Sequence, residues 1–144
     1  MRPIAKIIIH CSDSKWGDVS AIDDWHKARG WAGIGYHWVV VGGFPKSSKH
    51  YIESYDGLVQ RGRPEEKAGA HCRGQNRDSI GICMIGVDEF TPSQFEALER
   101  VVRGLQEAYN VSDAMVFGHR DWDKKKTCPN FDVSAWMKGL KKMP

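Results

Sequence analysis

The sequence predicts an α/β fold in which helices flank a central mixed β-sheet. Three apolar segments predict buried strands, at residues 5–11, 79–86 and 115–118, and the first of them is rich in β-branched residues. The clearest helix of the chain lies between the last two, so strands and helices alternate, as they do in α/β domains. The 144 residues contain no repeat or linker. We therefore expect a single domain over residues 1–144, with functional side chains at its strand ends.

Local signals define the other elements of the first half of the chain. Ser20 predicts the start of a short helix, which Gly30 ends. Residues 36–41 predict a second strand, stopped by two glycines. The segments 51–54 and 58–61 are predicted to be the arms of a hairpin, because an Asp-Gly turn lies between them.

The second half of the chain contains the strongest helix signal. Thr91 supplies an N-cap, Pro92 suits the first helical position and Gln94 completes a capping box. Apolar residues then recur at helical spacing, at Phe95, Leu98, Val101, Val102, Leu105 and Tyr109. Residues 133–141 predict a terminal helix.

Charge and hydropathy exclude several classes of protein. The net charge is only +3, and much of the basic excess lies in the three lysines at 124–126. Without a recognised module or interleaved aromatic residues, such a run is usually a solvated face, so we expect no nucleic-acid partner. The one apolar run near the N-terminus is too short for a signal peptide or a transmembrane segment. We expect a monomer.

The four cysteines do not form a metal-binding or redox motif of the CxxC type. A chain with an ample core and no export signal is expected to keep them reduced. Cys83 lies within an apolar strand and is expected in the core, whereas Cys72 lies in a loop and is expected to be an exposed thiol. Strand alternation is expected to turn Cys11 away from the side on which its neighbour His10 lies.

Three residues form a candidate zinc site. His10 and His119 each follow an apolar strand segment, and Cys128 lies nine residues beyond His119. Two imidazoles and one thiolate, with a fourth position left for water, match a catalytic zinc site. Spacing alone leaves the alternative open that the histidines are hydrogen-bonded residues near the core edge and the cysteine a buried apolar residue.

The remaining histidines have structural interpretations. Alternation along the strand turns His37 to the face opposite Tyr36, which predicts a structural role. His26, with Trp25, is expected to pack the first helix against the sheet. His50 has no motif around it.

Several short blocks, in this order, resemble the type-2 N-acetylmuramoyl-L-alanine amidases. The resemblance is strongest to the amidase-type lysozymes of tailed phages, with the animal peptidoglycan recognition proteins as relatives, and it implies their α/β fold. It covers nearly the whole chain, and we expect no separate cell-wall-binding domain. The blocks are residues 9–12 (IHCS), 29–37 (RGWAGIGYH), 69–71 (GAH), 76 (N), 79–82 (SIGI), 118–119 (GH) and 126–129 (KTCP).

The resemblance implies a zinc amidase that cuts the amide bond between N-acetylmuramic acid and the L-alanine of the peptidoglycan stem peptide. It implies that His10, His119 and Cys128 bind one Zn²⁺ ion, and that Tyr36 and Lys126 are catalytic. The chemistry of these groups agrees. A zinc ion polarises a carbonyl and lowers the pKa of its water to about 7, and an ammonium group stabilises a developing oxyanion.

The resemblance also implies two residues that contact the substrate, His71 and Asn76. For Asn76, stabilisation of its own loop is an equally good interpretation. The chain departs from the family at residues 43–51, where it is longer than the usual hairpin. We expect this segment to alter the wall of the substrate groove and the peptide preference.

The expected biological role is that of a phage endolysin. Such an enzyme would accumulate in the host cytoplasm without a signal peptide, and would act on the periplasmic cell wall once another protein has permeabilised the membrane. Two alternatives remain open. One is a peptidoglycan-binding or regulatory module that does not cut, and the other is a cytoplasmic amidase that recycles muropeptides.

Overall fold

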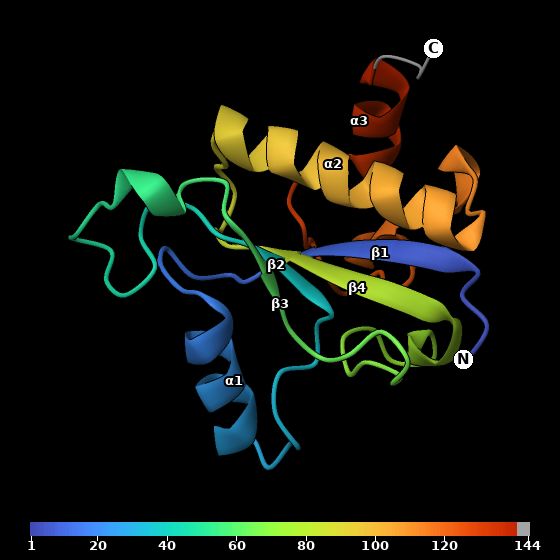
Figure 1. The fold of residues 1–144 in the computed structure, drawn as a ribbon, viewed down its shortest axis with the longest axis horizontal. Coiled ribbons are helices and arrows are strands. Elements are labelled where there is room, and N and C mark those ends of the chain that lie inside the picture. The colour runs from blue at the N-terminus through green and yellow to red at the C-terminus, as the bar shows by residue number, and fades with distance from the viewer. Residues whose placement is uncertain (141–144) are drawn as a thin grey trace.

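A single five-stranded sheet runs through the middle of the protein in the computed structural model, which describes residues 1–140. The strand order is β3-β2-β4-β1-β5; only β2 and β3 pair antiparallel. Helices α2 and α3 cover one face and α1 the other (Figure 1). The mixed α/β sheet predicted from the sequence is thus confirmed. The strands are β1 (Lys6–Cys11), β2 (Trp38–Val40), β3 (Val59–Arg61), β4 (Ser79–Met84) and β5 (Val116–Gly118), and the helices are α1 (Val19–Ala28), α2 (Pro92–Tyr109) and α3 (Val133–Gly139).

Strand alternation divides the apolar residues between two cores. Ile7 and Ile9 of β1 pack in the larger core, beneath α2 and α3. Val39 and Cys83 belong to the smaller core on the α1 side, and the core position of Cys83 is as expected. Because successive side chains of a strand point to opposite faces, His10 lies on the α1 side, away from the larger core.

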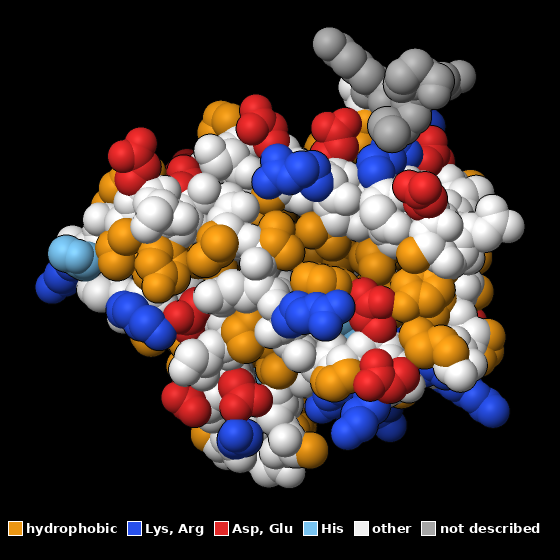
Figure 2. Space-filling view, viewed as in Figure 1, with side chains coloured by type: hydrophobic (Ala, Val, Ile, Leu, Met, Phe, Trp, Pro, Cys, Tyr) orange, Lys and Arg blue, Asp and Glu red, His pale blue; other side chains and the backbone are white. Residues whose placement is uncertain are grey.

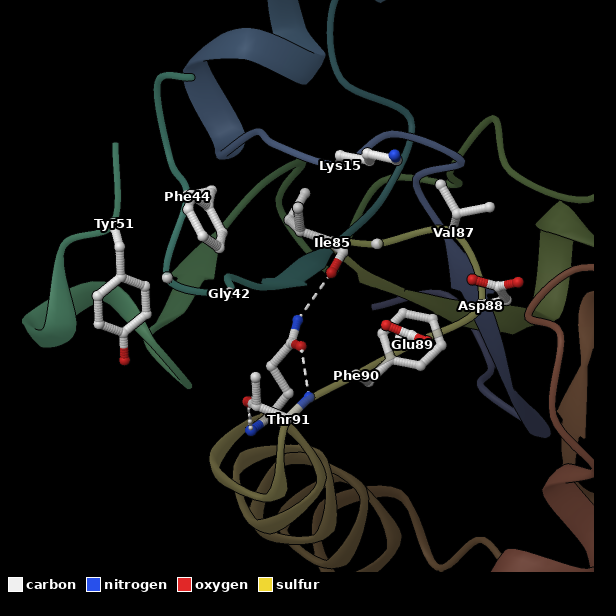
Figure 3. Close-up of a pocket in the computed structure, with 13 residues that line it drawn as sticks. Lys15, Gly42, Phe44, Tyr51, Ile85, Val87, Asp88, Glu89, Phe90 and Thr91 are labelled. Carbon is white, nitrogen blue, oxygen red and sulfur yellow. Dashed lines mark hydrogen bonds between the residues drawn. The ribbon is translucent and has the colours of Figure 1, made fainter. Parts of the chain in front are cut away.

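The start of α2 is tied to the sheet by the predicted capping box. The Thr91 hydroxyl accepts a hydrogen bond from the Gln94 backbone N–H at 3.1 Å, and Gln94 Oε1 accepts one from the Thr91 N–H at 3.0 Å. Gln94 Nε2 also donates to the Ile85 carbonyl, at 2.8 Å, just beyond β4 (Figure 3). Gln94 is fully buried, so these bonds fix the helix over the end of the strand.

The expectation that Ser20 caps the first helix is wrong. Asp18 is the N-cap, since its Oδ1 accepts a hydrogen bond from the Ala21 N–H at 2.9 Å. The carboxylate of Asp18 also pairs with Lys46 Nζ at 2.6 Å. A charged cap that is buried and paired in this way displaces the helix start by two residues relative to the prediction.

The predicted hairpin between residues 51–54 and 58–61 is also wrong. The hairpin arms are β2 and β3, paired from Trp38 with Arg61 to Val40 with Val59. Residues Glu53–Tyr55 form a 3-10 turn instead of a strand. The long 43–51 segment therefore lies in the connection between the two real arms, and Figure 1 shows this connection projecting beside α1 and the sheet.

Cys72 is not an exposed thiol, because only 2% of its surface is accessible. The terminal helix ends at Gly139, and the predicted extension to residue 141 lies outside the described residues. On the face of the molecule in Figure 2, basic and acidic side chains are interspersed.

Candidate metal centre and active site

Two neighbouring strands bring the candidate histidines together. Strands β1 and β5 are parallel, and Ile9 is in register with Gly118, so the residues that follow, His10 and His119, lie side by side. Their ring centroids are 4.5 Å apart. Cys128 completes the group: the potential ligand atoms of His10, His119 and Cys128 all lie within 4.8 Å of one another. The three residues that spacing suggested therefore meet in space.

The loop after β5 holds Cys128 in this position. Its carbonyl accepts a hydrogen bond from the Arg120 N–H at 2.8 Å, and its sulfur accepts one from the Cys11 N–H at 3.0 Å. Pro129, the residue after Cys128, approaches β5 so closely that position 118 requires a glycine, because a Cβ on Gly118 would lie 2.9 Å from Pro129 Cδ. Cys128 is thus held both by the segment just after β5 and by the last residue of β1.

Burial keeps the imidazoles of this cluster neutral. The pKa of His10 lies well below its ordinary value because the ring is buried, and His71 and His119 lower it further. Burial also lowers the pKa of His119. The pKa of the Cys128 thiol is raised by the adjacent Cys11 thiol and by burial. Neutral imidazoles are the form that binds metal, and a bound cation would offset the raised thiol pKa.

The donor set fits zinc. Two imidazoles and one thiol are typical ligands of this borderline-soft ion, and three protein ligands leave a fourth position for water or substrate. His119 and Cys128 line a cavity of about 540 Å³, so that position is accessible from solvent. The other residues that line the cavity are Cys11, Ser12, Asp13, His26, Arg29, Trp31, Tyr36, Ala70, His71, Lys125, Lys126, Thr127 and Asn130.

Tyr36 lies against the cluster, just before β2. Its ring centroid is 5.1 Å from that of His10. Burial raises the pKa of Tyr36 well above its ordinary value, and the neighbouring thiols Cys83, Cys128 and Cys11 add to the effect. The Tyr36 hydroxyl therefore keeps its proton at neutral pH, and its hydrogen bond with the Cys83 thiol partly offsets the rise that burial causes in the pKa of that thiol.

Lys126 lines the same cavity and lies in the exposed loop before Cys128. Its positive charge contributes to lowering the pKa of His119, after burial, which places the ammonium group within electrostatic range of the cluster. Lys125 lines the same cavity. Lys124, Lys125 and Lys126 are all exposed, but only the last two line the cavity, a difference that the sequence did not indicate.

His71 and Asn76 lie beside the cluster, but their polar groups are engaged within the protein. His71 Nδ1 is 2.8 Å from His10 Nε2, and His71 Nε2 is 3.1 Å from Ser79 Oγ. Asn76 Oδ1 accepts hydrogen bonds from the backbone N–H groups of His71 and Cys72. Asn76 thus stabilises its own loop, while substrate contact by either residue stays a prediction.

Strand alternation predicted that Cys11 would point away from the site, and this prediction is wrong. Cys11 lines the same cavity, and its sulfur accepts a hydrogen bond from Asn130 Nδ2 at 3.7 Å. The reason is that the segment after β5 wraps around the end of β1 and brings Cys128 to Cys11. The alternation of side chains along β1 gives no information about a distant segment that packs against the end of the strand.

His37 and His26 have internal partners, in line with the sequence analysis. His37 Nδ1 accepts a hydrogen bond from the Gly81 N–H at 3.0 Å. His26 Nδ1 accepts one from the Gly35 N–H at 2.9 Å, and its ring lies 5.5 Å from that of Tyr36. His26 therefore connects α1 to the segment that carries Tyr36, in addition to lining the cavity.

Protonation of His26 is expected to destabilise the fold. Burial, followed by the charges of Arg29 and Arg63, lowers the pKa of His26 to about 4. An unfolded histidine titrates near 6.5, so the unfolded state binds more protons and stability is lost as pH falls from about 6.5 towards 4. Relative to a His26→Gln variant, the unfolding free energy should fall by up to about 1.4 kcal/mol per pH unit in this window. Urea titrations between pH 7 and 4.5 measure this difference, and parallel profiles for the two proteins would contradict it.

No helix within residues 1–140 has both the length and the apolar character needed to cross a membrane.

The fold and the site together define a known class of cell-wall hydrolase. The chain belongs to the N-acetylmuramoyl-L-alanine amidase family, whose model matches residues 1–131. It is 32% identical over 145 residues to the endolysin of Enterobacteria phage K11, and the match covers 93% of this chain and 85% of that protein. These findings confirm the family inferred from the sequence motifs.

Solved structures agree with this assignment. The amidase LysC from Clostridium intestinale superimposes with a TM-score of 0.78 at 28% identity, covering 95% of this chain and 87% of LysC. Drosophila PGRP-LB superimposes with a TM-score of 0.73 at 25% identity, covering 96% and 82% of the two chains. The amidase and peptidoglycan recognition protein fold expected from the sequence is thus confirmed.

Proposed function

We propose that the protein is a zinc-dependent amidase that hydrolyses the bond between N-acetylmuramic acid and L-alanine in peptidoglycan. The observation that carries this proposal is the cluster of His10, His119 and Cys128 at the wall of a solvent-accessible cavity. These three residues would hold one ion. Family membership and the phage relatives support the same reaction.

The residues around the cluster suit amide hydrolysis. When bound, zinc supplies Lewis-acid activation of the scissile carbonyl and of a water molecule. The protonated Tyr36 hydroxyl donates a hydrogen bond that orients the attacking water. The Lys126 ammonium stabilises the negative charge that develops on the carbonyl oxygen. The acyl carbon would lie in the cavity that both residues line. Water adds to this carbon and gives up a proton, the C–N bond breaks, and the proton goes to the nitrogen, so that L-alanine departs as a neutral amine.

Replacing Tyr36 by phenylalanine is expected to leave the metal site intact and to slow turnover. The variant keeps the ring that packs against His10 but loses the hydroxyl proton donor. We expect kcat to fall by roughly 10²-fold, the lower end of the range for such a group. Zinc content by elemental analysis and the rate on purified sacculi measure the two effects separately. If the variant lost zinc, Tyr36 would instead be a structural support of the cluster.

Mass spectrometry of the products tests the reaction itself. Purified sacculi are incubated with the protein, with and without a chelator. We expect free stem peptides that carry a new L-alanine amine beside uncut glycan strands, and only when metal is present. If the protein sedimented with intact sacculi and released nothing, it would be a binding module and the catalytic roles of Tyr36 and Lys126 would be wrong.

We further propose that the biological role is that of an endolysin, since the phage relatives carry that name. Protein made in the cytoplasm should then lyse cells only after the inner membrane has been permeabilised. Expression with and without a membrane-permeabilising agent tests this. Cleavage of small soluble muropeptides without any action on sacculi would favour a recycling enzyme instead.

A further inference from the structure

A chain of hydrogen bonds runs from His10 into the interior of the protein. Its far end fixes the direction of every bond. Ser79 Oγ donates to the Gln75 carbonyl at 2.7 Å, and a carbonyl oxygen can only accept. This uses the single hydroxyl proton of Ser79. At its other contact, 3.1 Å from His71 Nε2, Ser79 Oγ must therefore be the acceptor.

The direction carries through His71 to His10. A neutral imidazole has one N–H donor and one acceptor nitrogen. Because His71 donates from Nε2, its Nδ1 has the lone pair and accepts from His10 Nε2, 2.8 Å away. The proton of His10 is then on Nε2 and its lone pair is on Nδ1. Both rings are buried and no carboxylate lies among their hydrogen-bond partners, so nothing compensates a positive charge on either and both are neutral.

We propose that His71 and Ser79 are positioning residues that fix the tautomer of His10, so that His10 presents Nδ1 to the metal. The metal in this statement rests on the proposed function, whereas the tautomer itself does not. An outer partner that accepts the second ring proton of a histidine ligand both orients the ring and raises its basicity. His71 would act on the metal centre only through His10.

The slot that holds His71 is built for an imidazole ring. A Cβ on Gly81 would lie 2.6 Å from ring atoms of His71, and a Cβ on Gly69 would lie 2.5 Å from His71 Cδ2. Ser79 and Gly81 are two residues apart on β4, so they face the same side of the sheet. Ser79 therefore forms a hydrogen bond with the edge of the ring, while Gly81 leaves room for the ring. This explains a hydroxyl and a glycine within a strand that is buried throughout.

The same contacts argue against direct substrate binding by the imidazole of His71. Both ring nitrogens are engaged, and only 7% of the residue is exposed. Its backbone N–H is bound to Asn76 Oδ1 at 2.9 Å, which holds the loop in place behind the ring.

Nuclear magnetic resonance of the metal-free protein tests the tautomers directly. Long-range ¹H–¹⁵N spectra of histidine-labelled protein distinguish Nε2–H from Nδ1–H rings. We expect both His10 and His71 to be in the Nε2–H form at pH 7. In Ser79→Ala, the Nε2–H of His71 loses its acceptor, and an Nδ1–H form of His10 should become populated. An Nδ1–H tautomer of His10 in the wild type would overturn the proposal whether or not the protein is an amidase.

Zinc affinity tests the consequence. In His71→Leu we expect the zinc dissociation constant, measured by competition with a chromogenic chelator, to rise roughly 10- to 100-fold. His71→Gln should restore most of the affinity, because its amide oxygen can accept from His10 and its NH₂ group can donate to Ser79. His50→Leu, a change at an exposed histidine, is the matched control and should bind zinc as the wild type does.

The outcomes separate the proposal from a loss of folding and from the proposed function. Circular dichroism establishes that each variant is folded. Wild-type affinity in His71→Leu, or a folded His71→Gln that binds no better than His71→Leu, would overturn the positioning role. If the wild type itself bound no zinc, the proposed function would fail, and the tautomer measurement would still decide the hydrogen-bond chain.

Discussion

Replacing Cys128 by serine is expected to abolish both tight zinc binding and hydrolysis. The residue would supply the only sulfur of the cluster formed with His10 and His119. Serine is a poor zinc ligand, so two imidazoles would remain, fewer than the three protein ligands of catalytic zinc sites. Elemental analysis of the purified variant and release of stem peptides from sacculi measure the two losses.

Cys72→Ser is the matched control for this substitution. Cys72 is also a cysteine without a disulfide, buried where Cys128 is half-buried, but it is not a member of the cluster. It should keep one zinc ion and near wild-type turnover. Full activity in a zinc-free Cys128→Ala protein would overturn the metal-dependent mechanism.

Replacing Lys126 by alanine is expected to lower kcat by roughly 10²- to 10³-fold while zinc content stays unchanged. Loss of one group that stabilises an oxyanion typically has an effect of this size. The change should fall on kcat more than on KM, because the charge that Lys126 stabilises develops only in the transition state. Steady-state kinetics on a soluble muropeptide, together with metal analysis, measure the three quantities.

Lys125→Ala is the matched control, since Lys125 is an adjacent lysine that lines the same cavity. The family resemblance places only Lys126 in register with a catalytic position, so Lys125→Ala should lose little activity. Equal losses in the two variants would mean that the general positive charge of the loop acts, and not one ammonium group.

The parts of the fold that the sequence predicted correctly depend on local patterns. β1 and β4 are buried on both faces, so most of their residues are apolar, and α2 has a capping box that its own first residues complete. β3 was paired with the wrong segment because its real partner, β2, lies across a long connection. A nearby Asp-Gly turn is a local signal, and pairing across a long loop leaves no such signal in the sequence.

The residues of the candidate site also divide into those that local patterns predict and those that depend on contacts between distant segments. His10 and His119 could be placed together because each follows a strand, and parallel neighbouring strands present equivalent residues at one edge. The place of His71 could not be derived in this way, because its partners come from β1 and β4 and its slot depends on two glycines. Cys11 was misjudged because it meets Cys128, which is 117 residues away along the chain.

The pairing of β1 with β5 has a consequence for the architecture as a whole. β5 is an edge strand held to β1 over three residue pairs, and the chain beyond it carries His119 and Cys128. A metal held jointly with His10 would therefore act as a cross-link between the beginning and the end of the chain. Since any ligand that binds only the folded state adds to its stability, part of the folding free energy would depend on the supply of zinc. Sequestering that metal would loosen the sheet edge as well as stop the reaction.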